Sequence, residues 1–271
     1  MLDELLNGLE IGIDFQNQLA LTFSGDDCLP SCFKTTQLAS NSFMAAAVAL
    51  VEYCNAAEQG NDLACAHTKS LNVNNRYASL WFARSLWPLG WKVGGVWDAI
   101  AGDYKCADGW IRLHTNAPHH KQAALSILQC DGTRDAVAAT LANVKADDAE
   151  LAIVQASGCA ATMRSLSAWQ QHPQGLSVAN EPLVHWEEHG VVDAERIRFE
   201  HVDSSRILQQ YRQDNVLAKF EPVQEPDLNP VIENATWGDV RRVWFPIEHD
   251  GVDASWDRPA TELRLFAPQW L

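Results

Sequence analysis

The stretch of residues 103–120 constrains the fold of this chain most, because it combines a hairpin turn, an aromatic strand and the start of a helix. Residues 104–106 and 110–114 are short apolar and aromatic runs around Ala-Asp-Gly, a pattern that predicts two antiparallel strands. We expect Gly109 to take the positive φ that a tight hairpin needs. Pro118 then predicts the start of a helix with His119 and His120 in its first turn.

Helical periodicity dominates the rest of the chain. Apolar residues recur at helical spacing over residues 36–58, which predicts a long buried helix, and over residues 75–87. We expect further helices after Pro118 and Thr133, another over residues 147–157 that closes on Gly158 as its C′ residue, and a short one capped by Ser165. Residues 182–186 predict a strand, and the Pro-rich residues 222–230 predict an extended linker.

These elements predict an α+β fold, mostly helical with a small antiparallel sheet. We expect three regions. Residues 1–101 form a helical N-terminal segment, residues 102–190 a small domain of a hairpin and helices, and residues 191–271 an extended linker and tail. With 47% apolar residues and eleven Trp, the chain is typical of a folded globule rather than a disordered one.

Charge and cysteine content limit the classes of partner. The formal net charge of −15 disfavours nucleic acid and anionic membranes, whose phosphates it would repel. The same repulsion acts on coenzyme A unless a local basic pocket offsets it. Seven Cys without a signal-like N-terminus favour reduced thiols over a disulfide framework. No apolar run reaches the roughly 18 residues that span a bilayer, so we expect a soluble, cytoplasmic protein.

Several segments resemble one known family. The hairpin reads ADGWIRLHTN at residues 107–116, and GCAATMRSLSAWQQHPQG follows at residues 158–175. Upstream stands LPSCFKTTQLASNSFMAAAVALVEY at residues 29–53, and a tail beginning GDVRRVWFPIEHDG occupies residues 238–271. These segments resemble the family III CoA-transferases, also called the CaiB/BaiF family. In that family, a similar hairpin, helix pair and Gly-Cys-Ala-Ala turn build the smaller of two domains.

The resemblance implies the family's small domain preceded by a long N-terminal helix. It also implies a CoA-transferase or racemase-like relative that acts on acyl-CoA or a small organic acid, with coenzyme A as the substrate thioester, in a homodimer or with a homologous partner subunit. The strand that opens the family's nucleotide-binding domain, similar to RVLDLTRVLAGP, has no counterpart here. The sequence therefore predicts a truncated member or one subunit of a split transferase, with a non-catalytic homologue serving as a structural or interaction protein as the alternative.

Asp14 is the candidate nucleophile that the resemblance implies. The family uses an Asp in a segment similar to GYDxxxQAxSG, where the carboxylate attacks the acyl-CoA. Here Asp14 precedes Gln18 by four positions, but Ser24 and Gly25 follow too late for the motif. A solvated Asp at a loop or helix start is the alternative interpretation.

The candidate substrate-binding residues surround the hairpin. Histidines beside the backbone N–H groups of a helix start could bind an acyl carboxylate or a pantetheine amide. In the alternative interpretation they cap the helix and pack beneath Trp110. The candidates are Asp103, Tyr104, His114, Asn116, His119 and His120.

No metal site is expected from the sequence. Residues 185–189 match the zinc pattern HxxEH, which requires a helix, but the flanking residues predict a strand. In a strand, His185 and His189 would lie about 13 Å apart. Cys28 and Cys32 have no second Cys pair and are expected to be loop thiols. We expect Cys159, which has no His at a motif spacing, to be a small buried packing residue.

Overall fold

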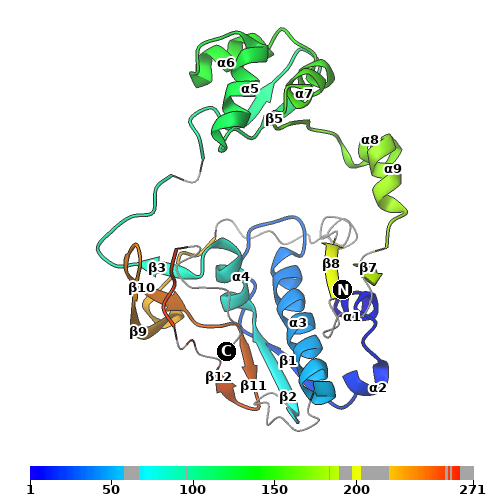
Figure 1. Cartoon of the computed structure of the whole chain (residues 1–271), viewed down its shortest axis with the longest axis vertical. Helices are drawn as coiled ribbons and strands as arrows, with labels where there is room; N and C mark the ends of the chain where they lie inside the picture. Colours follow the sequence, from blue (N-terminus) through cyan, green and yellow to red (C-terminus); the bar gives the residue numbers. More distant parts are fainter. Residues whose placement is uncertain are drawn as a thin grey trace. The chain divides into compact units, whose positions relative to one another are not determined.

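The computed structural model describes residues 1–57, 67–95, 97–182, 184–188, 197–202, 220–253, 256 and 258–262. The chain divides into two compact units, one formed by Met1–Lys92 with Glu181–Leu271 and the other by Val93–Asn180 (Figure 1). The small domain predicted at residues 102–190 overlaps the second unit. The regions predicted on either side of it both contribute to the first unit.

The first unit contains a mixed sheet beside a long helix. Its strands pair in the order β1-β2-β11-β12, and β1 and β2 run parallel. The chain passes from β1 through α3 to β2, which is a parallel crossover of the βαβ kind (Figure 1). The sequence did not predict this parallel pair, whose first strand β1 is mostly exposed. The elements are α1 (Leu2–Gly8), α2 (Ile13–Gln16), β1 (Ala20–Ser24), α3 (Thr35–Ala57), β2 (Ser70–Asn74), β11 (Ile247–His249) and β12 (Val252–Asp253).

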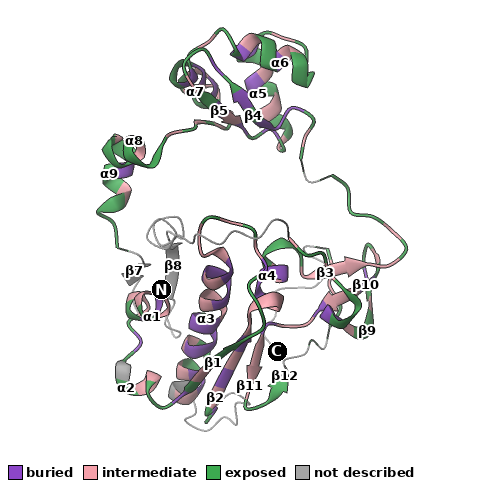
Figure 2. Ribbon diagram, turned by 180° about the vertical axis from the view of Figure 1, so that it is seen from behind, coloured by how far each residue is buried: buried purple, intermediate pink, exposed green. Residues whose placement is uncertain are grey.

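Burial explains the position of α3. The ribbon of α3 carries buried positions along its length (Figure 2). Among them, Met44 and Val48 are fully buried and pack with Leu6 of α1 and with Leu71 and Val73 of β2. The long helix predicted at residues 36–58 is thus confirmed within the described residues. Burying each large aliphatic side chain stabilises the fold by about 1.5–3 kcal/mol.

A second sheet of the first unit pairs β3-β10-β9, all antiparallel. It packs against α4 through Leu80, Leu228 and Val243. The predicted linker at residues 222–230 is wrong, since this stretch contains η1 and the start of β9. Pro226 stands in the first turn of η1, where a backbone donor is not needed. The elements are α4 (Asn75–Ala83), β3 (Leu86–Pro88), η1 (Glu225–Asp227), β9 (Leu228–Ala235) and β10 (Gly238–Val243).

The helix predicted at residues 75–87 is too long. It ends at Ala83, and Leu86 and Trp87 pair with β10 instead, so tertiary pairing overrides their helical spacing. The strand predicted at residues 182–186 corresponds to β7 (Val184–Glu188), which pairs with β8 (Ile197–Val202). His189 lies outside the described residues.

The second unit contains an antiparallel sheet covered by helices. Its strands pair in the order β4-β5-β6, and its core includes Ile111 and Leu113 of β5, Val137 of α6 and Ile153 of α7. The predicted hairpin, the helix at Pro118 and the short helix after Ser165 are all present. The elements are β4 (Gly102–Lys105), β5 (Trp110–Leu113), α5 (Pro118–Leu128), α6 (Arg134–Leu141), α7 (Ala146–Gln155), β6 (Ala160–Thr162), α8 (Leu166–Gln171) and α9 (Pro173–Ala179).

Two expectations about backbone conformation are wrong. Gly109 does not adopt a positive φ, whereas Gly102 at the start of β4 has φ +153°. After α7 the left-handed residue is Ser157, with φ +63°, and the N–H of Gly158 bonds to the carbonyl of Ile153 at 2.8 Å. The predicted α+β fold is confirmed. The small antiparallel sheet expected around the hairpin is the sheet β4-β5-β6, and the structure contains further sheets in addition to it.

Two further findings concern the hydrophobicity of the helices and the state of the cysteines. Among the helices that the structure describes, none is both long enough and apolar enough to cross a membrane. Cys54 is in a disulfide, which corrects the expectation that the thiols are all reduced. The thiols of Cys28, Cys32, Cys106, Cys130 and Cys159 are free.

Candidate functional site

Strand pairing brings His114 and Cys159 together. In the pairing of β5 with β6, Leu113 lies opposite Ala160, and continuing this register by one residue sets His114 opposite Cys159. The backbone N–H of His114 donates to the carbonyl of Cys159 at 3.0 Å. Leu113 points into the core, so its neighbour His114 points away from it. Two residues 45 positions apart in sequence therefore share the exposed face of the sheet.

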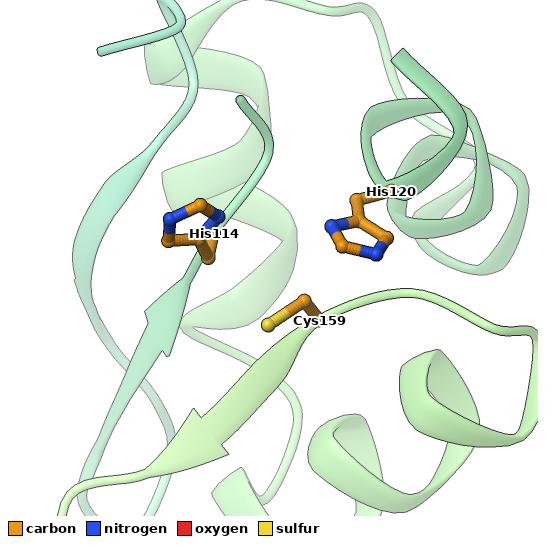
Figure 3. A group of neighbouring side chains, drawn as sticks. All are labelled: His114, His120 and Cys159. Carbon is orange, nitrogen blue, oxygen red and sulfur yellow. The ribbon is translucent and has the colours of Figure 1, made fainter. Parts of the chain in front are cut away.

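Helix α5 adds a second histidine to this pair. Pro118 occupies the first turn of α5, and Ala117 precedes it without a side-chain cap. The rings of His119 and His120 lie 4.2 Å apart between centroids, but His119 is exposed while His120 is half-buried. A ligating nitrogen of His114, one of His120 and the sulfur of Cys159 all lie within 4.8 Å of one another (Figure 3).

Asp98 holds the loop between β5 and α5 in place. Its carboxylate accepts hydrogen bonds from Lys121 Nζ at 2.8 Å and from Thr115 Oγ1 at 3.0 Å. The hydrogen bond from Lys121, together with those from Ile100 N–H and Thr115, lowers the pKa of Asp98 to about 2 despite partial burial. The backbone N–H of Asp98 donates to Asn116 Oδ1 at 2.9 Å. The side chain of Asn116 thus accepts a hydrogen bond that helps to hold this loop in place.

An aromatic and ionic pair borders His114. The edge of Trp97 meets the His114 ring at 5.8 Å between centroids, and the guanidinium of Arg112 lies 4.9 Å from the Trp97 ring centroid. Arg112 also forms an ion pair with Asp103 at 2.9 Å. Trp97 is 57% exposed, so this surface presents a ring and a cation to solvent beside the histidine.

Tyr104 belongs to the core rather than to this surface. Its side chain is buried, and its hydroxyl donates to the carbonyl of Ile100 at 2.8 Å. Burial raises the pKa of Tyr104, although the nearby Arg134 acts in the opposite direction. The Arg134 guanidinium lies 5.0 Å from the Tyr104 ring centroid and donates to Ala101 O. The hydroxyl of Tyr104 is therefore committed to the fold.

A separate polar hollow of the second unit lies beside α7. Arg164 forms ion pairs with Asp147 at 2.7 Å and with Glu150 at 3.0 Å. Burial works to raise the pKa of Glu150, but hydrogen bonds from Thr162 and Arg164 outweigh it and lower that pKa. His172 lines the same hollow. Because Arg164 is already paired with two carboxylates, this hollow offers little free positive charge to an anion.

The structure thus separates the predicted site residues into groups. His114, His119 and His120 lie near one another at one end of the hairpin, and Asn116 and Asp103 support the same end. Asp14 lies at the start of α2, exposed, in the other unit.

Cys159 belongs to this group although its sequence context does not reveal it. This residue was expected to be buried, but it is exposed and lies beside two imidazole rings. Spacing along the chain does not reveal its histidine partners, because they come from an adjacent strand and a helix. The available signal in the sequence was the alternation of apolar Ile111 and Leu113 with polar Arg112 and His114, which predicts that His114 faces away from the core.

Comparison with known proteins returned no relative. No family model, no curated protein and no solved structure matches this chain.

Proposed function

We propose that this chain is a family III CoA-transferase homologue that binds an acyl-CoA thioester as one subunit of a split transferase in the cytoplasm. The observation that carries the proposal is that residues 93–180 form a compact unit of their own. Almost all of the hairpin-to-HPQG resemblance falls inside that unit. The hairpin, the helix start at Pro118 and the Gly-Cys-Ala-Ala turn are neighbours in it.

The distribution of charge supports this assignment. Residues 93–180 contain six Lys or Arg and eight Asp or Glu, a net charge of −2, although the whole chain carries −15. Most of the acidity that would repel coenzyme A therefore lies outside this unit. Electrostatic repulsion of the phosphates at this surface is correspondingly weak.

The start of α5 offers donors to an anionic or amide group. The first-turn N–H groups of a helix lack intrahelical partners and favour negative charge, and α5 has no side-chain cap at Ala117. His119 is exposed at this position. Arg112 adds a partly exposed cation, 38% accessible, at the same end of the hairpin.

The carboxylates near this surface already have partners, which favours a binding role over a nucleophilic one. Asp98 is bound by Lys121 and Thr115, and Asp103 by Arg112. In a split transferase, a homologous partner subunit would supply the nucleophile, while this chain supplies part of the cleft wall. A non-catalytic homologue with a structural or interaction role is the second candidate, favoured by the same observation.

Native mass spectrometry of the full chain, with and without an acyl-CoA such as acetyl-CoA, tests the proposal. We expect retention of acyl-CoA to fall in Arg112→Gln and His119→Ala, and to be unchanged in Lys145→Gln. Lys145 is an exposed residue before α7, near the turn of the hairpin, and is therefore the charge-matched control. Absence of acyl-CoA from the wild-type chain, alone and with added partner subunit, would favour the structural role instead.

A further inference from the structure

We infer that His114, His120 and Cys159 form a site for a thiophilic divalent transition metal, for which Zn²⁺ is the best match. The ligating atoms of these three side chains all lie within 4.8 Å of one another. Figure 3 shows the three side chains gathered around a common space, two of them from adjacent strand ends and one from the helix. This inference is independent of acyl-CoA binding.

The spacing is close to that of a coordinated set. With Zn–N bonds of about 2.0–2.1 Å and a Zn–S bond of about 2.3 Å at tetrahedral angles, ligand atoms lie about 3.3–3.6 Å apart. The three side chains therefore need to approach by about 1 Å or a little more, which rotation about side-chain bonds provides. His114 and Cys159 are exposed and free to make this adjustment.

The backbone holds the ligands in place. His114 and Cys159 are fixed by the hydrogen bond of 3.0 Å between their main chains. His120 is in the first turn of α5, which Lys121 fastens to Asp98. Ligands on strands and helices are positioned more accurately than ligands on free loops, so the fold restricts the arrangement of all three groups before a metal arrives.

The imidazole ring of His120 has one nitrogen without a hydrogen-bond partner among the described residues. Its Nδ1 atom is buried and has no hydrogen-bond partner within the described part of the chain. A buried polar atom without a partner costs about 1–3 kcal/mol. Coordination of a metal through Nδ1 would give this atom a partner, which is the second observation that points to a bound ion.

The donor set selects the class of metal. One thiolate and two imidazoles suit Zn²⁺, whereas Mg²⁺ and Ca²⁺ require oxygen ligands. Three protein ligands leave a fourth tetrahedral position for water or another small ligand, as in zinc sites of the catalytic type. The surface beside Trp97 and His114 is exposed, so that fourth position is open to solvent.

Metal titration of the full chain, purified without a polyhistidine tag and freed of metal by a chelator, tests this site. We expect one equivalent of Zn²⁺ to bind in competition with a chromophoric chelator. Co²⁺ as a probe should give a thiolate-to-cobalt charge-transfer band that Cys159→Ser abolishes. His114→Ala and His120→Ala should each weaken Zn²⁺ binding by more than about 100-fold, because each removes a direct ligand.

Two matched controls separate this site from adventitious binding. His119→Ala removes the neighbouring histidine, which is not one of the three ligands, and Cys130→Ser removes a free thiol of the same unit. Both variants should bind Zn²⁺ with the affinity of the wild-type chain. The same His119→Ala variant is expected to lose acyl-CoA retention, so failure of one proposal is distinguishable from failure of the other.

Alkylation with iodoacetamide gives a test without substitutions. Zn²⁺ should slow alkylation of Cys159 while leaving the exposed Cys32 unaffected, as measured by peptide mapping. X-ray absorption of the loaded wild-type chain should show one sulfur and two imidazole nitrogens. Lack of a stoichiometric ion, equal affinity in the three ligand variants, or a zinc shell without sulfur would each overturn the inference.

Discussion

The carboxylate of Asp98 lies 2.8 Å from Nζ of Lys121, and this ion pair joins the segment before β4 to the first turns of α5. Thr115, in the loop between β5 and α5, is buried and bonds to the same carboxylate at 3.0 Å. One side chain thus fastens the loop that separates His114 from His120. The geometry of the candidate metal site depends on this contact although Asp98 does not belong to the cluster.

Substitution Asp98→Asn should therefore weaken both the fold and the metal site. Loss of the charged hydrogen bonds should lower the free energy of unfolding of the second unit by about 1–3 kcal/mol. We also expect Zn²⁺ affinity to fall by about 10-fold, since outer contacts that orient ligands typically contribute 10–100-fold. Urea unfolding and zinc competition measure the two effects. Asp131→Asn, a substitution in the turn before α6, is the control, and an effect equal to that of Asp98→Asn would contradict the assignment.

The pKa of Asp98 predicts a specific acid sensitivity. Because this pKa is lowered from 3.8 to about 2, the charged form is favoured in the folded state. The contribution of Asp98 to stability is then fully present above pH 3.8 and is lost as the pH falls toward about 2. The stability difference between wild type and Asp98→Asn should narrow over that interval. Urea unfolding series at successive pH values measure this, and a constant difference would be inconsistent with a lowered pKa of Asp98.

Gly102 and Gly109 provide a matched pair of substitutions in one hairpin. Gly102 has φ +153°, and a Cβ there would lie 2.6 Å from a guanidinium nitrogen of Arg134. We expect Gly102→Ala to destabilise the second unit by about 1–3 kcal/mol, because an Ala would be strained at this φ and Arg134 would have to move away from Tyr104. Gly109→Ala meets open space at a non-positive φ and should change the stability by less than about 0.5 kcal/mol. Thermal unfolding of both variants tests the contrast, and similar losses would refute it.

In the first unit, Arg76 and Asp227 form a two-pronged ion pair across 151 residues of sequence, with distances of 2.7 and 2.6 Å. Burial works to raise the pKa of Asp227, but the hydrogen bonds from Arg76 and Gln224 outweigh it and lower that pKa. Arg76→Leu leaves the buried carboxylate of Asp227 without its cation and should cost about 3–5 kcal/mol. Asp227→Leu should cost less, because Arg76 is partly exposed and keeps Glu221 as a partner at 3.7 Å. The double variant should recover part of this loss in a double-mutant cycle. Additive losses, measured by urea unfolding, would show that the pair is not coupled.

Local sequence patterns predicted many elements of this fold. The helical spacing over residues 36–58, Pro118 at a helix start and Ser165 as an N-cap correspond to α3, α5 and α8. These features depend on interactions between near neighbours in the chain, such as the hydrogen bond that the N–H of Ala168 donates to Ser165 Oγ. Residues that repeat along one face or cap one turn carry that information in the sequence itself.

Long-range pairing decided the rest. The parallel pair β1 and β2 and the strand formed by Leu86 and Trp87 each depend on a partner far away in the chain. The sequence identified His114 and His120 as polar residues near a hairpin and a helix start. Only the antiparallel register between β5 and β6, which sets Cys159 opposite His114, brings a thiol to them. That register results from burying Ile111 and Leu113 together with the core of α6 and α7, a packing effect that spacing along the chain does not encode.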